Sequence, residues 1–494
     1  MPSQENIVHT TPANAPPALR IGIFFDGTGN DDKVENSDSF SNIKYLYEMH
    51  EGDGKRIERD QFSLRKFYQR GVGSESKGIL NWAIDGAGNA GGYGAAIRFD
   101  NAIFYIEKFI NEYKNGYQGH LPPIIELDIF GFSRGAAMAR HFVNCIKQNY
   151  FDFSDPEINS VFSAKNIFIN FLGIFDTVGS FNIAGDNADF GFSFHIKPSW
   201  IVKKAVHIYA LNEYRWGFDL QALINTQDSN YPIDIINDNF IEIGLPGAHS
   251  DIGGGYNMNK HEQFSDNTFL ACMALEKMAE FAIDNGVHLA SNYKDSNRRS
   301  VKITNKSFAN MQSSYNKILP HIEKNELRSA LGIWREHIAL LDIYKHNNKI
   351  KDLTASKKIG RMRRAELSKQ KNIRDTINNH REIVDLFEKK LISKFSTLEE
   401  FEIFKVNYNT LYIDYMHRSH YPFNTTIGMG QQDADDNFWF WNKTVSDDRP
   451  HRDIFYNQYT DFELENSKRV RRYQGEVQQA SPEFKVLKSV EWKD

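Results

Sequence analysis

Cysteine is nearly absent from this sequence of 494 residues, in which only Cys145 and Cys272 occur. Both lie in apolar, helix-like stretches, so we expect two buried thiols, with neither a disulfide framework nor a cysteine-based metal site. No uninterrupted apolar run of about 18 residues is present, which argues against a membrane-spanning helix. The N-terminus also lacks a basic start followed by an apolar run. Without that signal-peptide pattern, we expect a protein made in the cytoplasm.

Charge of one sign is not in excess either. Lysine and arginine number 59 against 64 aspartate and glutamate residues, which leaves a net charge of −5. This balance predicts no general attraction to nucleic acid or to an anionic membrane. Hydrophobic residues at 40% and charged residues at 25% are ordinary for a globular protein. The length permits one large domain with insertions or two structural units.

Short apolar runs alternate with helix-like segments through the first 290 residues. Strands are predicted at 19–25, 66–70, 124–130, 166–175 and 240–245, and helices at 97–113, 136–148 and 270–283. This alternation predicts an α/β fold with a mostly parallel sheet flanked by helices. In such sheets the functional residues lie beyond the carboxyl ends of the strands.

The composition divides the chain into four predicted regions. Residues 1–18 read as a flexible lead-in and 19–290 as the α/β catalytic domain. Residues 291–405 read as a mainly helical additional module, because apolar residues recur at helical spacing from Leu327 to Leu341 and a capping box over 396–399 opens a further helix. The aromatic-rich region 406–494 is expected to pack back on the catalytic domain.

The sequence GFSRG (131–135) matches the G-x-S-x-G pattern of a nucleophile elbow. A predicted strand precedes it and a predicted helix follows it, as that motif requires. Downstream, Asp176 and His249 each follow a predicted strand, in the order Ser, Asp, His that α/β-hydrolases use. We therefore expect a triad in which Asp176 orients His249 and His249 takes the proton of Ser133.

An oxyanion hole is the second requirement of this chemistry. The backbone N–H of Arg134, directly after the serine, is one candidate donor. The second is expected from Gly27 or Thr28, in the glycine-containing loop after the first strand. The mechanism needs neither a cofactor nor a metal.

Several alternatives remain open from the residues alone. Ser133 could be an inert serine in a tight strand-to-helix connection, and Asp176 could cap a turn. Asp251 could be a metal ligand. Asp26 invites comparison with aspartyl phosphotransferases, although DGTGN lacks their second aspartate. The histidines that compete with His249 as the base are His207, His417 and His420.

Five motifs together resemble a known family. They are FFDGTGN (24–30), GVGS (71–74), GFSRGAAMAR (131–140), FLGIFDTVGS (171–180) and LPGAHSDIGGGY (245–256). Their order and spacing resemble the α/β-hydrolase domain of the first family of type VI secretion lipase effectors, over roughly residues 20–285, with a weaker echo in DYMHRSHYPFN (414–424). The resemblance carries the triad roles onto Ser133, Asp176 and His249.

The resemblance implies an antibacterial phospholipase of A2 or A1 type that cleaves acyl esters of glycerophospholipids. It also implies export through the type VI machine to a target cell's periplasm, a spike or needle component as delivery partner, and a cognate immunity protein. A membrane-associating module would correspond to 291–405, in which the basic segment 357–374 could favour anionic headgroups. The alternatives are a housekeeping cytosolic carboxylesterase and a catalytically silent hydrolase-fold interaction protein.

Overall fold

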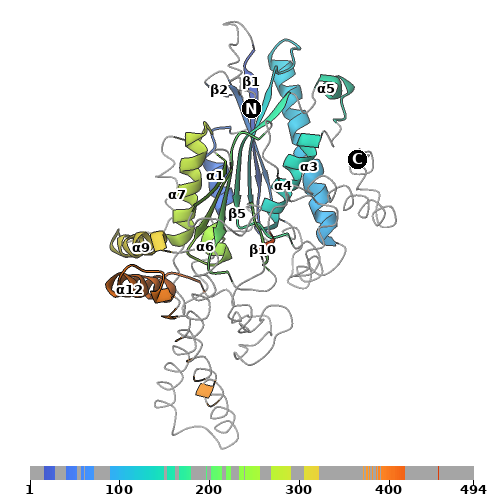
Figure 1. Ribbon diagram of the computed structural model, residues 1–494. Helices are drawn as coiled ribbons and strands as arrows, with labels where there is room; N and C mark the ends of the chain where they lie inside the picture. The colour runs from blue at the N-terminus through green and yellow to red at the C-terminus, as the bar shows by residue number, and fades with distance from the viewer. Residues whose placement is uncertain are drawn as a thin grey trace, which may run out of the picture.

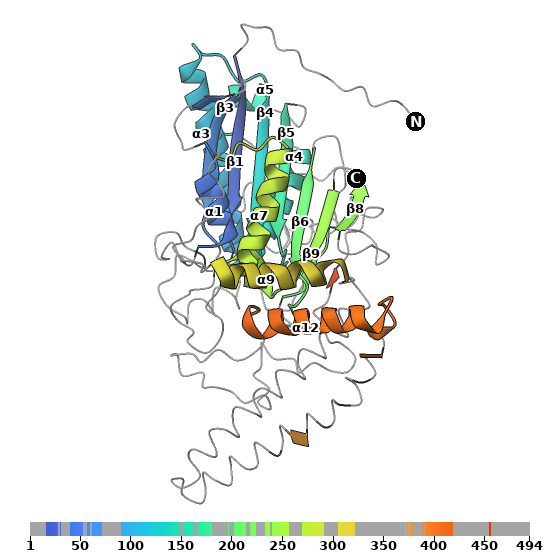
Figure 2. The ribbon, with the colours of Figure 1, turned by 90° about the vertical axis from the view of Figure 1, so that its left-hand side faces the viewer.

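The computed structural model (Figures 1 and 2) describes most of the first 290 residues and parts of the remainder. The described residues are 16–27, 30, 40–52, 57–59, 62–71, 90–148, 153–161, 166–179, 196, 202–213, 218–223, 233–237, 240–255, 269–290, 305–321, 391–417 and 454–455, with single positions between 371 and 389.

An eight-stranded sheet in the order β2-β3-β1-β4-β5-β6-β9-β8 forms the centre of the structure. Its strands are β1 (Ala18–Phe25), β2 (Ile57–Arg59), β3 (Phe62–Gln69), β4 (Ile125–Phe132), β5 (Ile167–Phe175), β6 (Ala205–Ala210), β8 (Ile233–Asn237) and β9 (Phe240–Leu245). The two edge strands β2 and β8 pair antiparallel with their neighbours, and all other neighbours are parallel. A separate small sheet joins β7 (Leu220–Gln221) to β10 (Ile454–Phe455).

Helices cover both faces of the large sheet (Figure 1). One face carries α1 (Asn42–Met49) and α7 (Phe269–Asp284), and the other carries α3 (Ala90–Gly116) and α4 (Arg134–Gln148), with α5 (Pro156–Val161) nearby. This arrangement confirms the predicted fold class, α/β with a mostly parallel sheet flanked by helices. The short helix α6 (His249–Gly253) follows β9 at the carboxyl end of the sheet.

The two faces are two separate cores because side chains alternate along each strand. Ile21 and Ile23 of β1 and Ile129 of β4 belong to the core under α3 and α4. Phe24 and Phe130 face the other way, where their rings stack at 5.0 Å between centroids in the core under α1 and α7. Burial on both faces explains why apolar side chains point in both directions from these strands.

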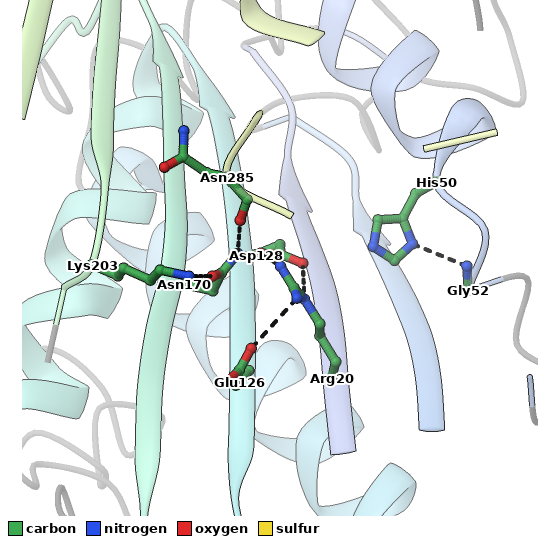
Figure 3. Close-up of polar contacts among 8 residues, drawn as sticks. All are labelled: Arg20, His50, Gly52, Glu126, Asp128, Asn170, Lys203 and Asn285. Carbon is green, nitrogen blue, oxygen red and sulfur yellow. Dashed lines mark hydrogen bonds and ion pairs between the residues drawn. The ribbon is translucent and has the colours of Figure 1, made fainter. Parts of the chain in front are cut away.

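A polar network ties the strands together near their amino ends (Figure 3). Arg20 Nε lies 2.7 Å from Asp128 Oδ2, and Arg20 Nη1 lies 3.5 Å from Glu126. Asn170 Nδ2 donates to Asp128 Oδ1 at 2.8 Å and to the carbonyl of Asn285, just after α7, at 3.1 Å. Because these charges are paired and hydrogen-bonded, they can be buried here without a large penalty.

Most predicted strands and helices are confirmed, with shifts at their ends. The strand predicted at 124–130 extends through Phe132, so the elbow turn is confined to Ser133. Among the elements that the sequence does not predict are the strand β6 and the helix α1. The expected capping box is displaced by one residue: Thr397 is the N-cap of α12 (Leu398–Asp414) and its side chain accepts the Glu400 N–H at 3.1 Å. Cys145 and Cys272 are free and buried, as expected.

Beyond residue 290, α9 (Asn305–Ile318), a short 3-10 helix (Leu319–His321) and α12 lie across the carboxyl end of the sheet (Figure 2). Tyr315, Phe404 and Tyr408 from these helices belong to the same core as α1 and α7. Among the described helices, none is long and apolar enough to cross a membrane. The helical spacing predicted over 327–341 and most of the basic segment 357–374 lie outside the described residues.

Candidate active site

Ser133 forms the turn between β4 and α4, with a φ of 57°. A Cβ on Gly131 would lie 2.6 Å from the Cα of Ala136, and one on Gly135 would lie 2.3 Å from the carbonyl oxygen of Phe25. Both glycines are therefore required by close backbone approach. The Ser133 N–H donates to the carbonyl of Phe175 at 3.1 Å, which fixes the turn to the end of β5.

Asp176 directly follows β5 and is fully buried. Its φ of 37° is also positive, so two of the three described non-glycine residues with positive φ are candidate triad members. Such strained conformations persist where the surroundings over-determine them, often at active sites. The Ala210 N–H, at the end of β6, donates to Asp176 Oδ1 at 2.7 Å. That bond leaves Oδ2 to face the loop after β9.

His249 opens α6, and its Nδ1 lies 2.6 Å from Asp176 Oδ2. Its backbone N–H donates to the buried carboxylate of Glu213 at 3.2 Å. Glu213 is not among the site residues predicted from the sequence. Asn212, beside it, holds the loop before α6 by accepting the Gly247 N–H at 2.9 Å. Asp176 and His249 thus form a buried, hydrogen-bonded pair at the carboxyl edge of the sheet.

Phe132 connects this pair to the elbow. Its ring lies 4.6 Å from the His249 ring, centroid to centroid. A Cβ on Gly253 would come within 1.9 Å of the Phe132 ring, and one on Gly27 within 2.5 Å. The three candidate triad residues are therefore gathered at one edge. No hydrogen bond joins the Ser133 hydroxyl to His249 among the described residues, so that contact stays a prediction.

The oxyanion-hole candidates differ in what the structure shows. Arg134 begins α4, where N–H groups of the first turn are not used by the helix's own bonding pattern. The Gly27 N–H donates to Asp26 Oδ1 at 2.6 Å, so a role for Gly27 would require that bond to open. Thr28 lies outside the described residues. These donors stay predictions.

The carboxylate of Asp26 accepts four hydrogen bonds in this structure, which suits a structural role rather than that of a nucleophile. Besides the Gly27 N–H, its carboxylate accepts from Asn30 Nδ2 at 3.0 Å, Ser41 Oγ at 2.6 Å and Tyr68 Oη at 2.5 Å. Burial raises the pKa of Asp26, and the four donors act in the opposite direction. This bonding fixes the loop after β1 against α1 and β3.

His207, a competing candidate base, belongs to a different buried pair. Its Nδ1 lies 2.9 Å from Glu242 Oε2, and its Nε2 accepts the Thr177 N–H at 3.2 Å. Burial lowers the pKa of His207, although Glu242 opposes that shift. With both ring nitrogens engaged, His207 supports the turn next to Asp176 instead of facing the elbow.

Asp251 and His417 also pair with each other. His417 Nδ1 lies 2.5 Å from Asp251 Oδ1, and Oδ2 accepts the N–H groups of His417 at 2.9 Å and Ala248 at 3.0 Å. Three protein donors therefore occupy the carboxylate suggested above as a metal ligand. Within the described part of the chain, no group of three His, Cys, Asp or Glu residues could hold a metal ion. His420 lies outside it.

Residues 20–150 and 152–280 match the family model described as the catalytic domain of the Tle1-like phospholipase effectors of type VI secretion. The match covers more than half of the chain. The chain belongs to the Tle1-like effector family. All three candidate triad residues of this Tle1-like chain lie within the matched residues.

Two solved structures are similar to the Tle1-like chain. One is a crystal structure of an uncharacterized protein from Pseudomonas aeruginosa, at 20% identity and a TM-score of 0.44, covering 79% of this chain and 64% of that one. The other is a Tle1 effector bound to the VgrG spike of the type 6 secretion system, at 21% identity and a TM-score of 0.42, covering 64% of this chain and 84% of that one. The Tle1-like chain thus spans 64% of the length of the Pseudomonas protein. No curated protein matches it.

Proposed function

We propose that the protein hydrolyses acyl esters of glycerophospholipids through Ser133, Asp176 and His249. Asp176 holds His249 in the tautomer that carries the hydrogen on Nδ1, so that Nε2 can accept the Ser133 proton. The serine oxygen then attacks the ester carbonyl, and His249 returns the proton to the leaving alcohol. Water hydrolyses the acyl-enzyme in a second, equivalent step, which releases the fatty acid.

The observation that carries this proposal is the 2.6 Å contact between His249 Nδ1 and Asp176 Oδ2 at the same sheet edge as the elbow serine. A carboxylate accepts only, so the imidazole must donate from Nδ1, which leaves Nε2 as the acceptor of a neutral ring. Ser133 and Asp176 are further supported by their positive φ. The family match supplies the lipid class of the substrate.

For the tetrahedral oxyanion, we propose the Arg134 N–H as one donor, with Gly27 or Thr28 as the second. Each such donor typically contributes about 2.7–4 kcal/mol to the stability of the transition state. The N-terminal end of α4 adds a favourable dipole at the same place, because the partial positive charge of a helix is at its N-terminus.

We also propose a biological role, on the basis of the family to which the chain belongs. The protein would be an antibacterial phospholipase effector of A2 or A1 type, exported by the type VI machine. An immunity protein would inhibit it in the cell that makes it. A Tle1 effector has been solved in complex with the VgrG spike. A spike component is therefore the partner class to test first.

Mass spectrometry of phospholipid vesicles treated with the wild type and with Ser133→Ala tests the activity and the nucleophile together. Fatty acid and lysophospholipid should accumulate only with the wild type, and the lysophospholipid isomer identifies the bond that is cleaved. Equal release by Ser133→Ala would refute the proposal. Toxicity on targeting to the periplasm of a test bacterium separates an effector from a housekeeping esterase, and no release by either protein indicates a silent scaffold.

A further inference from the structure

The helix that carries His249 is short and packs against a segment far along the chain. α6 has only five residues, Gly247 precedes it with a φ of 136°, and Gly254 follows it with a φ of 80°. A helix this short cannot hold its position through its own backbone bonds. Contacts from the surrounding residues must therefore fix where the imidazole of His249 lies.

One of these contacts comes from the end of α12. His417 reaches Asp251, two residues beyond His249, with both its side chain at 2.5 Å and its backbone N–H at 2.9 Å. Asp251 in turn accepts the Ala248 N–H at 3.0 Å, from the residue directly before His249. The Asp251 carboxylate thus connects the residue before His249 to His417, and so holds the turn that carries the imidazole.

A second contact reaches the same loop from α12. The Tyr408 hydroxyl accepts from Asn212 Nδ2 at 2.9 Å, and Asn212 Oδ1 accepts the Gly247 N–H at 2.9 Å. Residues 408–417 therefore support both the approach to α6 and α6 itself. They lie more than a hundred residues beyond the end of the family-model match at residue 280.

We propose that His417 is a positioning residue for the catalytic histidine, acting through Asp251. This inference rests on the proposed function, because it assigns the role of His249 as general base. When His417 Nδ1 donates to Asp251, α6 is held in the orientation in which His249 meets Asp176. Without that donor, the backbone N–H of residue 417 is the one bond of His417 that still holds Asp251, and the imidazole of His249 no longer has a single position.

Two substitutions in the full-length protein test the proposal. His417→Asn keeps an N–H donor close to the position of Nδ1. His417→Leu removes the donor and replaces the imidazole with an apolar side chain of similar size. On phospholipid vesicles, His417→Leu should lower kcat by up to about 10²-fold with KM unchanged, because small misplacements of catalytic groups cost that much. His417→Asn should recover most of that loss.

A second measurement is independent of turnover. The proton between His249 Nδ1 and Asp176 Oδ2 should give a downfield NMR resonance that is identified by its loss in His249→Gln. It should broaden in His417→Leu and persist in His417→Asn. An unchanged resonance in a folded His417→Leu would overturn the proposal, as would an equal loss of kcat in both variants.

The outcomes separate this inference from the proposed function. If Ser133→Ala still hydrolyses vesicles, the proposed nucleophile is wrong, and the resonance still decides whether His417 positions His249. If Ser133→Ala is inactive and His417→Leu keeps full kcat, the proposed function stands and the positioning role falls. Circular dichroism of each variant establishes that it is folded.

Discussion

Asp176→Asn is the most discriminating substitution at the candidate triad, because the structure fixes how the new amide must orient. Oδ1 of Asp176 accepts the Ala210 N–H at 2.7 Å, and Oδ2 faces His249 Nδ1 at 2.6 Å. An amide has one acceptor oxygen and one NH₂ group. If the oxygen stays with Ala210, the NH₂ faces His249.

This orientation reverses the direction of the hydrogen bond to the imidazole. The NH₂ of the introduced amide donates, so His249 Nδ1 must accept and the ring hydrogen moves to Nε2. The opposite orientation would place the NH₂ against the Ala210 N–H and leave two buried donors unsatisfied, at about 1–3 kcal/mol each. The favoured state therefore carries a hydrogen on the nitrogen that should take the Ser133 proton.

The expected loss in kcat is large and the expected loss in stability is small. A wrong tautomer of this kind lowers kcat by about 10⁴-fold, which corresponds to about 5.5 kcal/mol of transition-state stabilisation. The free energy of unfolding should change little, because the amide has the shape of the carboxylate and both contacts are kept. Initial rates of fatty-acid release and urea unfolding curves measure the two quantities.

Glu242→Gln is the matched control, since Glu242 is equally buried and also pairs with a histidine. Its Oε2 accepts both from His207 and from the Leu223 N–H, so an amide oxygen at that position can keep both bonds. We expect kcat near the wild-type value. The reasoning is refuted if Asp176→Asn keeps kcat within about tenfold, a difference of about 1.4 kcal/mol, or if Glu242→Gln loses as much.

Two further predictions concern packing and pH. Gly253→Ala should lower the free energy of unfolding by about 1–3 kcal/mol and should also lower kcat, because the added methyl group would meet the Phe132 ring at 1.9 Å and displace the His249 imidazole packed on it. In the control Gly119→Ala, nothing lies within 4 Å of the added methyl group, so the φ of 87° alone should destabilise the protein and kcat should be kept. Equal kcat in the two variants would contradict this. Burial lowers the pKa of His50 and His141 from 6.5 to about 3, so the unfolded state binds more protons than the folded state between those two pH values. The free energy of unfolding should therefore fall as the pH drops below about 6.5, by up to about 1.4 kcal/mol per pH unit for each histidine. Urea unfolding at several pH values should give a shallower acid dependence for His141→Phe than for the wild type, and an equally steep one would disprove the assignment.

The strands that the sequence predicted best are those in which large apolar residues predominate, with one charged or amide side chain in each. β1, β5 and β9 are buried on both faces, so hydrophobicity alone marks them. β6 was missed because it is short, two of its five apolar residues are alanines, and His207 interrupts them; His207 is buried where Glu242 pairs with it from β9. That pairing joins residues 35 apart in sequence, and local periodicity carries no sign of it.

The candidate site was predictable to the level of strand ends. Asp176 and His249 each follow a buried run, and parallel strands bring their carboxyl ends to one edge, so their meeting could be anticipated. The supporting contacts could not. Glu213 and Tyr408 lie in a loop and on a distant helix, and a hydrogen-bonding side chain in such places has no spacing rule. From the sequence, His417 of DYMHRSHYPFN is only a rival base, whereas in the structure it contacts Asp251.

The positive φ of Ser133 sets stability against activity at the candidate nucleophile. Glycine adopts that conformation without strain, so replacing Ser133 with glycine relieves a backbone cost of about 1–3 kcal/mol. A library of variants selected only for thermal resistance would therefore enrich glycine at this position and discard the hydroxyl. Asp176 does not share this conflict, because glycine there would remove the acceptor of the Ala210 N–H and of His249 Nδ1. Selection for turnover must continuously oppose this replacement at Ser133. A lineage that no longer needs the enzyme would therefore lose the serine of the elbow first.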